Sequence, residues 1–140
     1  MITVQTNKVN VKTGGEFDVK DITLLLEKFV AGSGVKEGQA SAFVSGSTAA
    51  ITTIEFEPGL VHDMKQALSR LFPKDIEYKH HEKWGDDNGR SHIRAAFLKP
   101  GVSVPVTKGK LMLGQWQQVV LVELDTRPRE REIVLQIIGE

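Results

Sequence analysis

The carboxy-terminal stretch VSVPVTKGKLMLGQWQQVVLVELDTRPREREIVLQIIGE, residues 102–140, decides the fold class of this chain. Runs of β-branched and other apolar residues alternate in it with short segments rich in Gly, Pro and charged residues. The pattern predicts four strands, with tight turns at residues 107–109 and 126–130. The last third of the chain is therefore predicted to be β-sheet.

Upstream of this stretch, two more segments predict strands. Residues 2–12 alternate polar and apolar side chains and end at a glycine pair. Residues 39–57 are rich in β-branched and small residues, which indicates either two strands or one strand bent near Gly46. The sheet should therefore contain strands from both ends of the chain.

Two helices are predicted between these strands. The first has Asp18 as its N-cap and ends at Gly32 and Gly34. The second covers residues 60–71, where apolar residues recur at helical spacing. Strands with helices between them and a strand-rich final third predict an α+β fold built on antiparallel sheet, with residues 1–140 as one domain.

The composition narrows the classes of function. Lys plus Arg equals Asp plus Glu, 18 each, so no net charge attracts the chain to nucleic acid or to an anionic membrane. The absence of cysteine excludes a cysteine nucleophile and suits a reducing cytoplasm. The amino terminus lacks a signal-peptide pattern, and no segment has the roughly 18 apolar residues of a membrane span. We therefore expect a cytoplasmic protein with small-molecule partners.

The stretch YKHHEKWGDDNGRSH, residues 78–92, holds three of the four histidines and is the first place to look for chemistry. Interpreted as a strand, residues 76–81 put His80 on the apolar face and His81 on the solvent face. A glycine-bounded turn then leads to a short helix that carries His92. We therefore expect His80 and His92 to converge on one pocket, while His81 points away.

The same stretch offers ligands for a metal. Imidazoles and carboxylates suit Zn²⁺ or another divalent ion such as Mg²⁺, and the four candidate ligands are His80, His92, Asp86 and Asp87. Their spacing matches no compact metal motif. Adjacent aspartates are also typical of a solvated turn, and a core histidine bonded to a carbonyl explains His80 equally simply. Both interpretations stay open at this point.

Three further groups of residues have both a chemical and a structural interpretation. Small hydroxyl residues can bind a phosphate, but they also occur where sheets approach closely. Alternating arginines can hold an anion or pair with neighbouring glutamates, and a tryptophan beside a glutamine can line a pocket or fill a core. The residues are Ser45, Ser47 and Thr48; Arg127, Arg129 and Arg131; and Trp116 with Gln117.

Four blocks of sequence, in this order, resemble the YjbQ-like family, which is named for a secondary thiamine-phosphate synthase activity and has long been uncharacterised. The blocks are SGSTAAITTIEFEPGLVHDM, YKHHEKWGDDNGRSHIRAAFL, SVPVTKGKLMLGQWQQVVLVELDTRPRERE and IIGE. They cover nearly the whole chain from about residue 39 onward. The amino-terminal strand and helix are compatible with the family.

The resemblance implies a β-sandwich of mostly antiparallel strands with flanking helices. It also implies a homotrimer whose sheets pack around a threefold axis, with a pocket near the subunit boundaries. Long apolar strands at residues 119–124 and 133–138 favour the trimer as well, because a small monomer would struggle to cover both their faces.

The resemblance further implies the site residues, which are carried over position by position. The expected catalytic residues are His80, His92 and Glu123; the expected substrate-binding residues are Ser47, Thr48, Trp116, Gln117 and Arg129; and Asp86 and Asp87 join the two histidines as metal ligands. Two departures weaken a three-histidine metal site. Ser45 and Gly46 stand where many bacterial relatives have histidine and threonine, and Arg90 stands where some have a further histidine.

The activity associated with the resemblance joins a hydroxymethylpyrimidine diphosphate to a thiazole phosphate and releases pyrophosphate. Cations would have to stabilise the charge that develops on the leaving group. We therefore expect an enzyme that acts on a phosphorylated heterocycle. The alternative is a trimeric protein that binds a ligand or metal without turnover.

Overall fold

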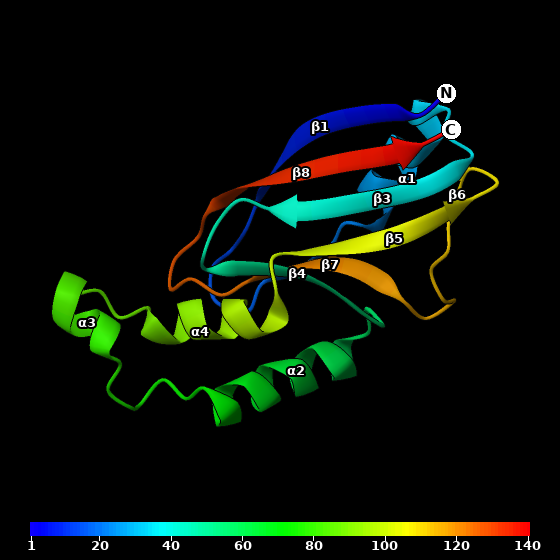
Figure 1. Ribbon diagram of the computed structural model, residues 1–140. Coiled ribbons are helices and arrows are strands. Elements are labelled where there is room, and N and C mark those ends of the chain that lie inside the picture. Colours follow the sequence, from blue (N-terminus) through cyan, green and yellow to red (C-terminus); the bar gives the residue numbers. More distant parts are fainter.

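The computed structural model describes the backbone of residues 1–140 and every side chain except those of Lys83 and Trp84. Eight strands and four helices follow one another along the chain (Figure 1). The strands are β1 (Thr3–Lys12), β2 (Val19–Asp21), β3 (Glu37–Val44), β4 (Ala49–Ile54), β5 (Gly101–Thr107), β6 (Lys110–Leu111), β7 (Gln118–Glu123) and β8 (Glu130–Gly139). The helices are α1 (Thr23–Ser33), α2 (Pro58–Leu71), α3 (Lys79–Trp84) and α4 (Gly89–Leu98). In this described part of the chain, no helix is long and apolar enough to cross a lipid bilayer.

The strands form two sheets. The larger has the order β1-β8-β3-β5-β6 and the smaller β2-β7-β4, and the pairings within both are antiparallel. β7 and β8 are consecutive but belong to different sheets, so the turn at residues 126–130 carries the chain from one sheet to the other. The predicted class is confirmed: the fold is an α+β sandwich of antiparallel strands with flanking helices.

β7 separates two hydrophobic cores because its side chains alternate between the two faces of the smaller sheet. Val119 and Leu121 pack between the two sheets, where Leu26 of α1 joins them. Val120 and Val122 pack in the second core, to which α2 and α4 contribute. In Figure 1, α1 lies behind the larger sheet, and α2 and α4 lie below the smaller one. Each fully buried side chain of this size contributes roughly 1.5–3 kcal/mol to stability.

The first helix begins later than the sequence predicts. Residues 19–21 form β2, which pairs with β7, and α1 starts only at Thr23. Asp18 is therefore not an N-cap, and its carboxylate instead accepts a hydrogen bond from the Gly14 N–H at 2.7 Å. The predicted end is confirmed, because Gly34 terminates α1 with a left-handed φ of 78° that glycine adopts at little cost.

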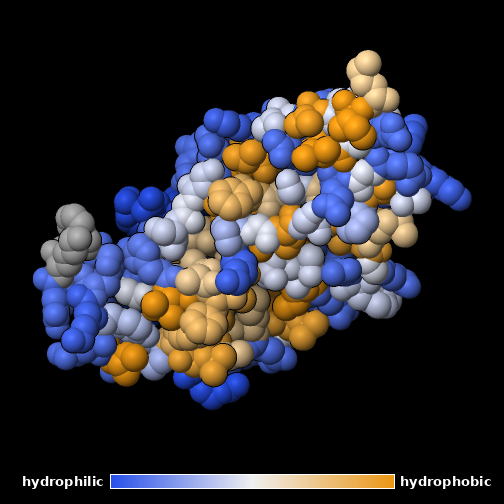
Figure 2. Space-filling model, viewed as in Figure 1, coloured by the Kyte–Doolittle hydropathy of each residue, from blue (hydrophilic) through white to orange (hydrophobic). Residues whose placement is uncertain are grey.

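The two apolar strands offered in favour of a trimer differ from each other. Residues 119–124 are fully buried by the chain's own layers, so β7 gives no reason for a partner subunit. β8 buries its inward side chains but leaves Ile138 46% exposed on the outer face of the larger sheet. Val4 and Phe43 are also exposed there, and Figure 2 shows apolar side chains among polar ones on this side of the molecule. Any support for a trimer therefore comes from the outer face of the larger sheet.

Candidate functional site at the histidine pair

The segment that carries the first two histidines is a helix, so the strand predicted over residues 76–81 is wrong. Tyr78 is the N-cap of α3, and Gly85 ends the helix in the left-handed conformation with φ 69°. The Tyr78 hydroxyl donates a hydrogen bond to the Pro73 carbonyl at 2.7 Å, which fixes the start of the helix. Alternation over six residues cannot distinguish a strand from a short helix, and no described strand pairs with this segment.

The two predicted histidines nevertheless converge. The ring centroids of His80, on α3, and His92, on α4, are 4.5 Å apart, and the ring planes are inclined by 58°. His81 is exposed, and its Nδ1 lies 2.9 Å from the backbone carbonyl oxygen of Asp86. The structure thus confirms that His80 and His92 meet, but the pocket of about 180 Å³ at this segment is lined by His81, Asp86 and Asp87 and by neither ring of the pair.

The two adjacent aspartates have different partners. Asp86 Oδ1 lies 3.7 Å from His80 Nε2. Asp87 Oδ2 lies 3.3 Å from Arg90 Nη1, and the same nitrogen donates to the Asp87 carbonyl oxygen at 2.7 Å. Asp86 is therefore the aspartate of the histidine pair, whereas Asp87 binds the first turn of α4.

α4 is held in place by two buried arginines that the sequence interpretation did not include. Arg90 Nε and Arg94 Nη1 donate to Glu16 Oε2 at 2.9 and 2.8 Å. Burial opposes ionisation of Glu16, but hydrogen bonds and charge from Arg90 and then Arg94 outweigh it and lower the Glu16 pKa. Arg94 also donates twice to the Phe72 carbonyl, at 3.1 and 2.7 Å. These contacts fix the helix that carries His92.

A third aspartate, Asp125, lies two residues beyond β7 in a cluster of hydrogen bonds. Its Oδ2 accepts hydrogen bonds from the Thr48 hydroxyl at 3.1 Å and from Arg129 Nη1 at 2.8 Å. Its Oδ1 accepts one from the Thr126 N–H at 2.7 Å. Burial opposes ionisation, but these donors outweigh it and hold the Asp125 pKa below its ordinary value. Asp125 is therefore an ionised, firmly held carboxylate.

His92 lies within the electrostatic reach of this cluster. Burial and the neighbouring His80 both lower the His92 pKa, and the charges of Asp125 and Asp86 oppose that shift without cancelling it. His92 is therefore neutral at pH 7, when one of its ring nitrogens can accept a proton.

Glu123, the carboxylate expected to face the histidines, is 0% exposed. Its Oε1 accepts hydrogen bonds from the Thr13 hydroxyl at 2.7 Å and from Arg131 Nε at 2.8 Å. Its Oε2 accepts from the Leu124 and Asp125 N–H groups, at 3.1 and 3.0 Å. Such a carboxylate has little capacity left for a substrate, and the carboxylate charges that act on His92 are those of Asp125 and Asp86.

The other predicted substrate-binding residues separate into two groups. Thr48 and Arg129 both contact Asp125, and Ser47 is exposed beside Thr48. Trp116 and Gln117 instead precede β7, whose six residues span roughly 20 Å, so within one chain they lie at the opposite end of that strand.

The surroundings of this second group are also different. Trp116 is 67% exposed and is not a core residue. The Gln117 side chain accepts from the Gly114 N–H at 3.0 Å and donates to the Thr53 hydroxyl at 3.2 Å. In a single chain, neither residue reaches the histidine pair.

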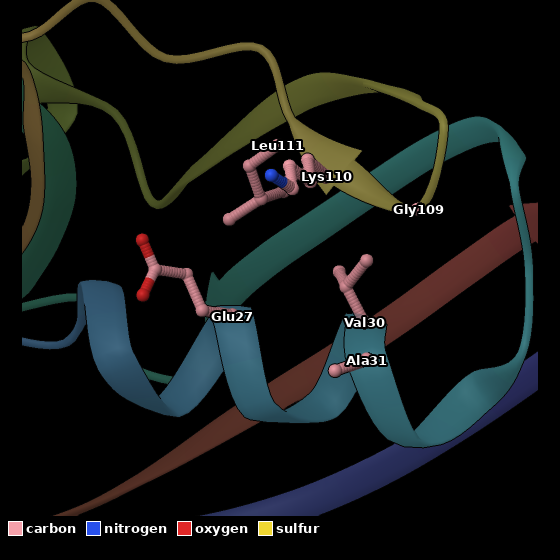
Figure 3. Close-up of a pocket in the computed structure, with 6 residues that line it drawn as sticks. All are labelled: Glu27, Val30, Ala31, Gly109, Lys110 and Leu111. Atoms are coloured by element: carbon pink, nitrogen blue, oxygen red, sulfur yellow. The ribbon is translucent and has the colours of Figure 1, made fainter.

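Two other features of the chain are weaker candidates for a site. A cavity of about 440 Å³ lies between α1 and the β5–β6 hairpin (Figure 3). Glu27 and Lys110 are its only charged lining residues, and it lies at the end of β5 remote from α4. Among the side chains that the structure describes, no group of three or more His, Asp or Glu is arranged to hold a metal ion. The histidine pair therefore remains the strongest candidate site in the chain.

Sequence reasoning missed Asp125, although a signal for it exists. VVLVELD places two carboxylates at alternate positions at the end of an otherwise apolar run, and alternate positions share one face of a strand. Acids in such a run need buried partners. That rule points to Glu123 and Asp125 together and to the arginines after the following turn.

Comparison with known proteins gives a consistent result. The family described as "UPF0047 protein YjbQ-like" matches residues 7–140. A UPF0047 protein of Methanothermobacter thermautotrophicus is 34% identical over 137 residues, which is 98% of this chain and 94% of that protein.

Solved structures agree with the sequence relatives. A crystal structure described as a YbjQ-like protein of unknown function from Sulfolobus solfataricus is 38% identical, covers 100% of both chains and superposes with a TM-score of 0.94. An uncharacterised protein of the YjbQ/UPF0047 family from Clostridium acetobutylicum is 33% identical over 94% of this chain and 98% of its own, with a TM-score of 0.84.

Proposed function

The chain belongs to the YjbQ-like UPF0047 family, and on that premise we propose that it is an enzyme that acts on a phosphorylated small molecule at the histidine pair. The observation that supports this most is the approach of His80 and His92 to 4.5 Å, with the Asp125 charge acting on His92. Arg129, bound to the same aspartate, adds a fixed positive charge. Imidazole and guanidinium groups bind phosphate oxygens and, in the case of imidazole, transfer protons.

The proposal gives each group a role. Neutral His92 has one N–H donor, which it directs to a phosphate oxygen of the leaving group. His80, 3.7 Å from Asp86, donates a hydrogen bond to a phosphate oxygen. Arg129, whose side chain is 33% exposed, stabilises the negative charge of the leaving phosphate.

The family resemblance specifies a reaction to test. In a thiamine-phosphate synthase-like transfer, the C–O bond between a pyrimidine methylene and its diphosphate breaks, and the thiazole nitrogen forms the new C–N bond. Pyrophosphate leaves with the bonding electron pair. The protein has only to orient the two substrates and stabilise the leaving group, which is the work that histidines and an arginine perform.

The proposal includes a homotrimer with the site at a subunit boundary. The exposed Trp116 and the outer face of the larger sheet, with Ile138 and Phe43 exposed, support it. Trp116 and Gln117 then complete the site of a neighbouring copy, since they cannot reach the histidine pair of their own chain. Light scattering tests this part, and a monomer at micromolar concentration would refute it.

Measurement of pyrophosphate release tests the enzyme proposal. Protein without a histidine tag is screened against phosphorylated heterocycles, beginning with the pyrimidine diphosphate and thiazole phosphate pair. We expect His92→Ala to lose about 100-fold of the rate, the typical cost of removing one donor that stabilises developing negative charge. His81→Ala, next to His80 but outside the pair, is the matched control and should retain the wild-type rate. Wild-type protein that releases no pyrophosphate from any member of the set would contradict the proposal.

A second candidate function is divalent-metal binding without turnover. His80 and His92 with Asp86 supply the donor types that Zn²⁺ accepts, and the 3.7 Å approach of Asp86 to His80 favours this set. Asp87, bound to Arg90, does not belong to it. Because the described side chains of one chain do not form a complete metal site, a further ligand would have to come from a neighbouring copy. Metal analysis of the untagged protein distinguishes the two candidate functions. Bound metal together with no turnover favours the metal-binding protein.

A further inference from the structure

A buried ion pair lies beneath the candidate site. Arg131 of β8 and Glu123 of β7 are 4% and 0% exposed, and they meet across the sandwich because the chain changes sheets between them. Arg131 donates to Glu123 through Nε, at 2.8 Å, and through Nη2. Burying two charges costs several kcal/mol per ion, and a hydrophobic pair of similar size is often at least as stable. Stability alone therefore gives a weak reason for this pair.

The ion pair determines the direction of a hydrogen bond in the site. Arg131 Nη2 donates to the Thr48 hydroxyl oxygen at 2.8 Å. A guanidinium group has only donors, so Thr48 must accept this bond and turn its own hydrogen elsewhere. The Asp125 Oδ2 atom, 3.1 Å away, is the acceptor that it meets. The two hydrogen bonds thus run in one direction: Arg131 donates to Thr48, and Thr48 donates to Asp125.

A glycine in the neighbouring loop leaves space for the Arg131 side chain. A Cβ atom at position 46 would lie 2.9 Å from Arg131 Nη1, so a larger residue than Gly46 would displace the guanidinium or the loop. Thr48 follows two residues later, and its carbonyl accepts from the Leu124 N–H at 3.0 Å. The loop before β4 and the end of β7 are therefore held together around the arginine.

We propose that Arg131 is a positioning residue that acts through Thr48 to hold the Asp125 carboxylate, which binds Arg129 of the proposed site. The proposal rests on the proposed function, because it assigns Asp125 to the same site. Glu123 neutralises the arginine and keeps its Nη2 aimed at Thr48. Neither residue touches the substrate, which distinguishes this role from the catalytic role first expected for Glu123.

Thr48 provides the sharpest test because it has two near-isosteric replacements. Thr48→Val removes the hydroxyl and keeps the shape, whereas Thr48→Ser keeps the hydroxyl. The first readout is the ¹H–¹⁵N resonance of the Thr126 amide in ligand-free protein, because this amide donates to Asp125 at 2.7 Å. We expect the proton resonance to move upfield in Thr48→Val and to return in Thr48→Ser. The second readout is the calorimetric affinity for pyrophosphate, expected to fall about tenfold in Thr48→Val alone.

A paired substitution tests the arginine itself. Glu123→Gln with Arg131→Gln removes both charges together and avoids leaving one of them uncompensated. The same upfield shift of the Thr126 resonance is expected, and this variant also serves if Thr48→Val does not fold. A Thr126 resonance that stays at its wild-type position in both variants would overturn the positioning role. Wild-type protein that binds no pyrophosphate would instead contradict the proposed function, while the resonance still tests the hydrogen-bond chain.

Discussion

The two ends of β7 differ in almost every physical respect. At the carboxyl end, Glu123 and Asp125 are buried, and their oxygens accept hydrogen bonds from arginines, hydroxyls and backbone N–H groups. At the amino end, Trp116 is exposed, and the Gln117 side chain bonds to the Gly114 N–H and to the Thr53 hydroxyl. One end is preorganised within a single chain, and the other is available to a second molecule. The comparison separates positions whose substitution should affect folding from positions whose substitution should affect only assembly and binding.

The largest effect is expected at the buried end, from Arg131→Ala. This change leaves the Glu123 carboxylate buried without its cation, which typically costs about 3–5 kcal/mol. Urea unfolding measures the loss. The paired variant Glu123→Gln with Arg131→Gln is the control and should lose much less of the free energy of unfolding. If Arg131→Ala lowers that free energy by less than about 1 kcal/mol, the two ends of β7 do not differ as described.

Gly46→Ala should have the next largest effect. The added methyl group meets Arg131 Nη1 at 2.9 Å, so the guanidinium or the loop must move. Overpacking of this kind costs about 1–3 kcal/mol. Thermal unfolding of Gly46→Ala beside the wild type measures the loss. A melting temperature equal to that of the wild type would show that the loop around Arg131 is not tightly packed.

The pH dependence of the free energy of unfolding should reflect the ionisation of Asp125. Its folded pKa lies below its ordinary value of 3.8, so the unfolded chain takes up a proton first as the pH falls. Asp125 therefore stabilises the fold fully above its unfolded pKa, and this contribution is lost as the pH falls through that value towards the folded pKa. The stability difference between wild type and Asp125→Asn should be largest near pH 6 and shrink below about pH 4. A difference that is constant between pH 6 and pH 3 would contradict this account.

The smallest effect on folding is expected at the other end, from Trp116→Ala. Substitution of an exposed residue with no described hydrogen bond should change stability by no more than about 0.5 kcal/mol. In the trimer proposal it should nevertheless weaken pyrophosphate binding. Mixing Trp116→Ala subunits with His92→Ala subunits should then restore part of the activity, because some sites receive one intact residue from each. No recovery in the mixed oligomer would place the two residues in separate sites.

The sequence predicted the fold class well because the strands are long and their patterns are strong. It failed at α3, since six residues around His80 fit strand and helix equally, and at Asp18, where pairing with β7 overrides the helix signal. The meeting of His80 and His92 was predicted correctly although the strand assigned to His80 was wrong, because a tight turn between them is enough to bring them together. The pairing of Glu123 with Arg131 was not predicted, because the two residues meet only when the chain changes sheets at residues 126–130. Local patterns contain no information about such a crossover.

A crystal structure of the protein with bound pyrophosphate tests the central claim most directly. The account predicts a phosphate group within hydrogen-bonding distance of His80 or His92 and of Arg129, with Asp125 in the position it has in the ligand-free chain. Pyrophosphate bound instead in the cavity between α1 and β6, beside Lys110, or only on the outer face of the larger sheet, would contradict the assignment of the histidine pair as the functional site.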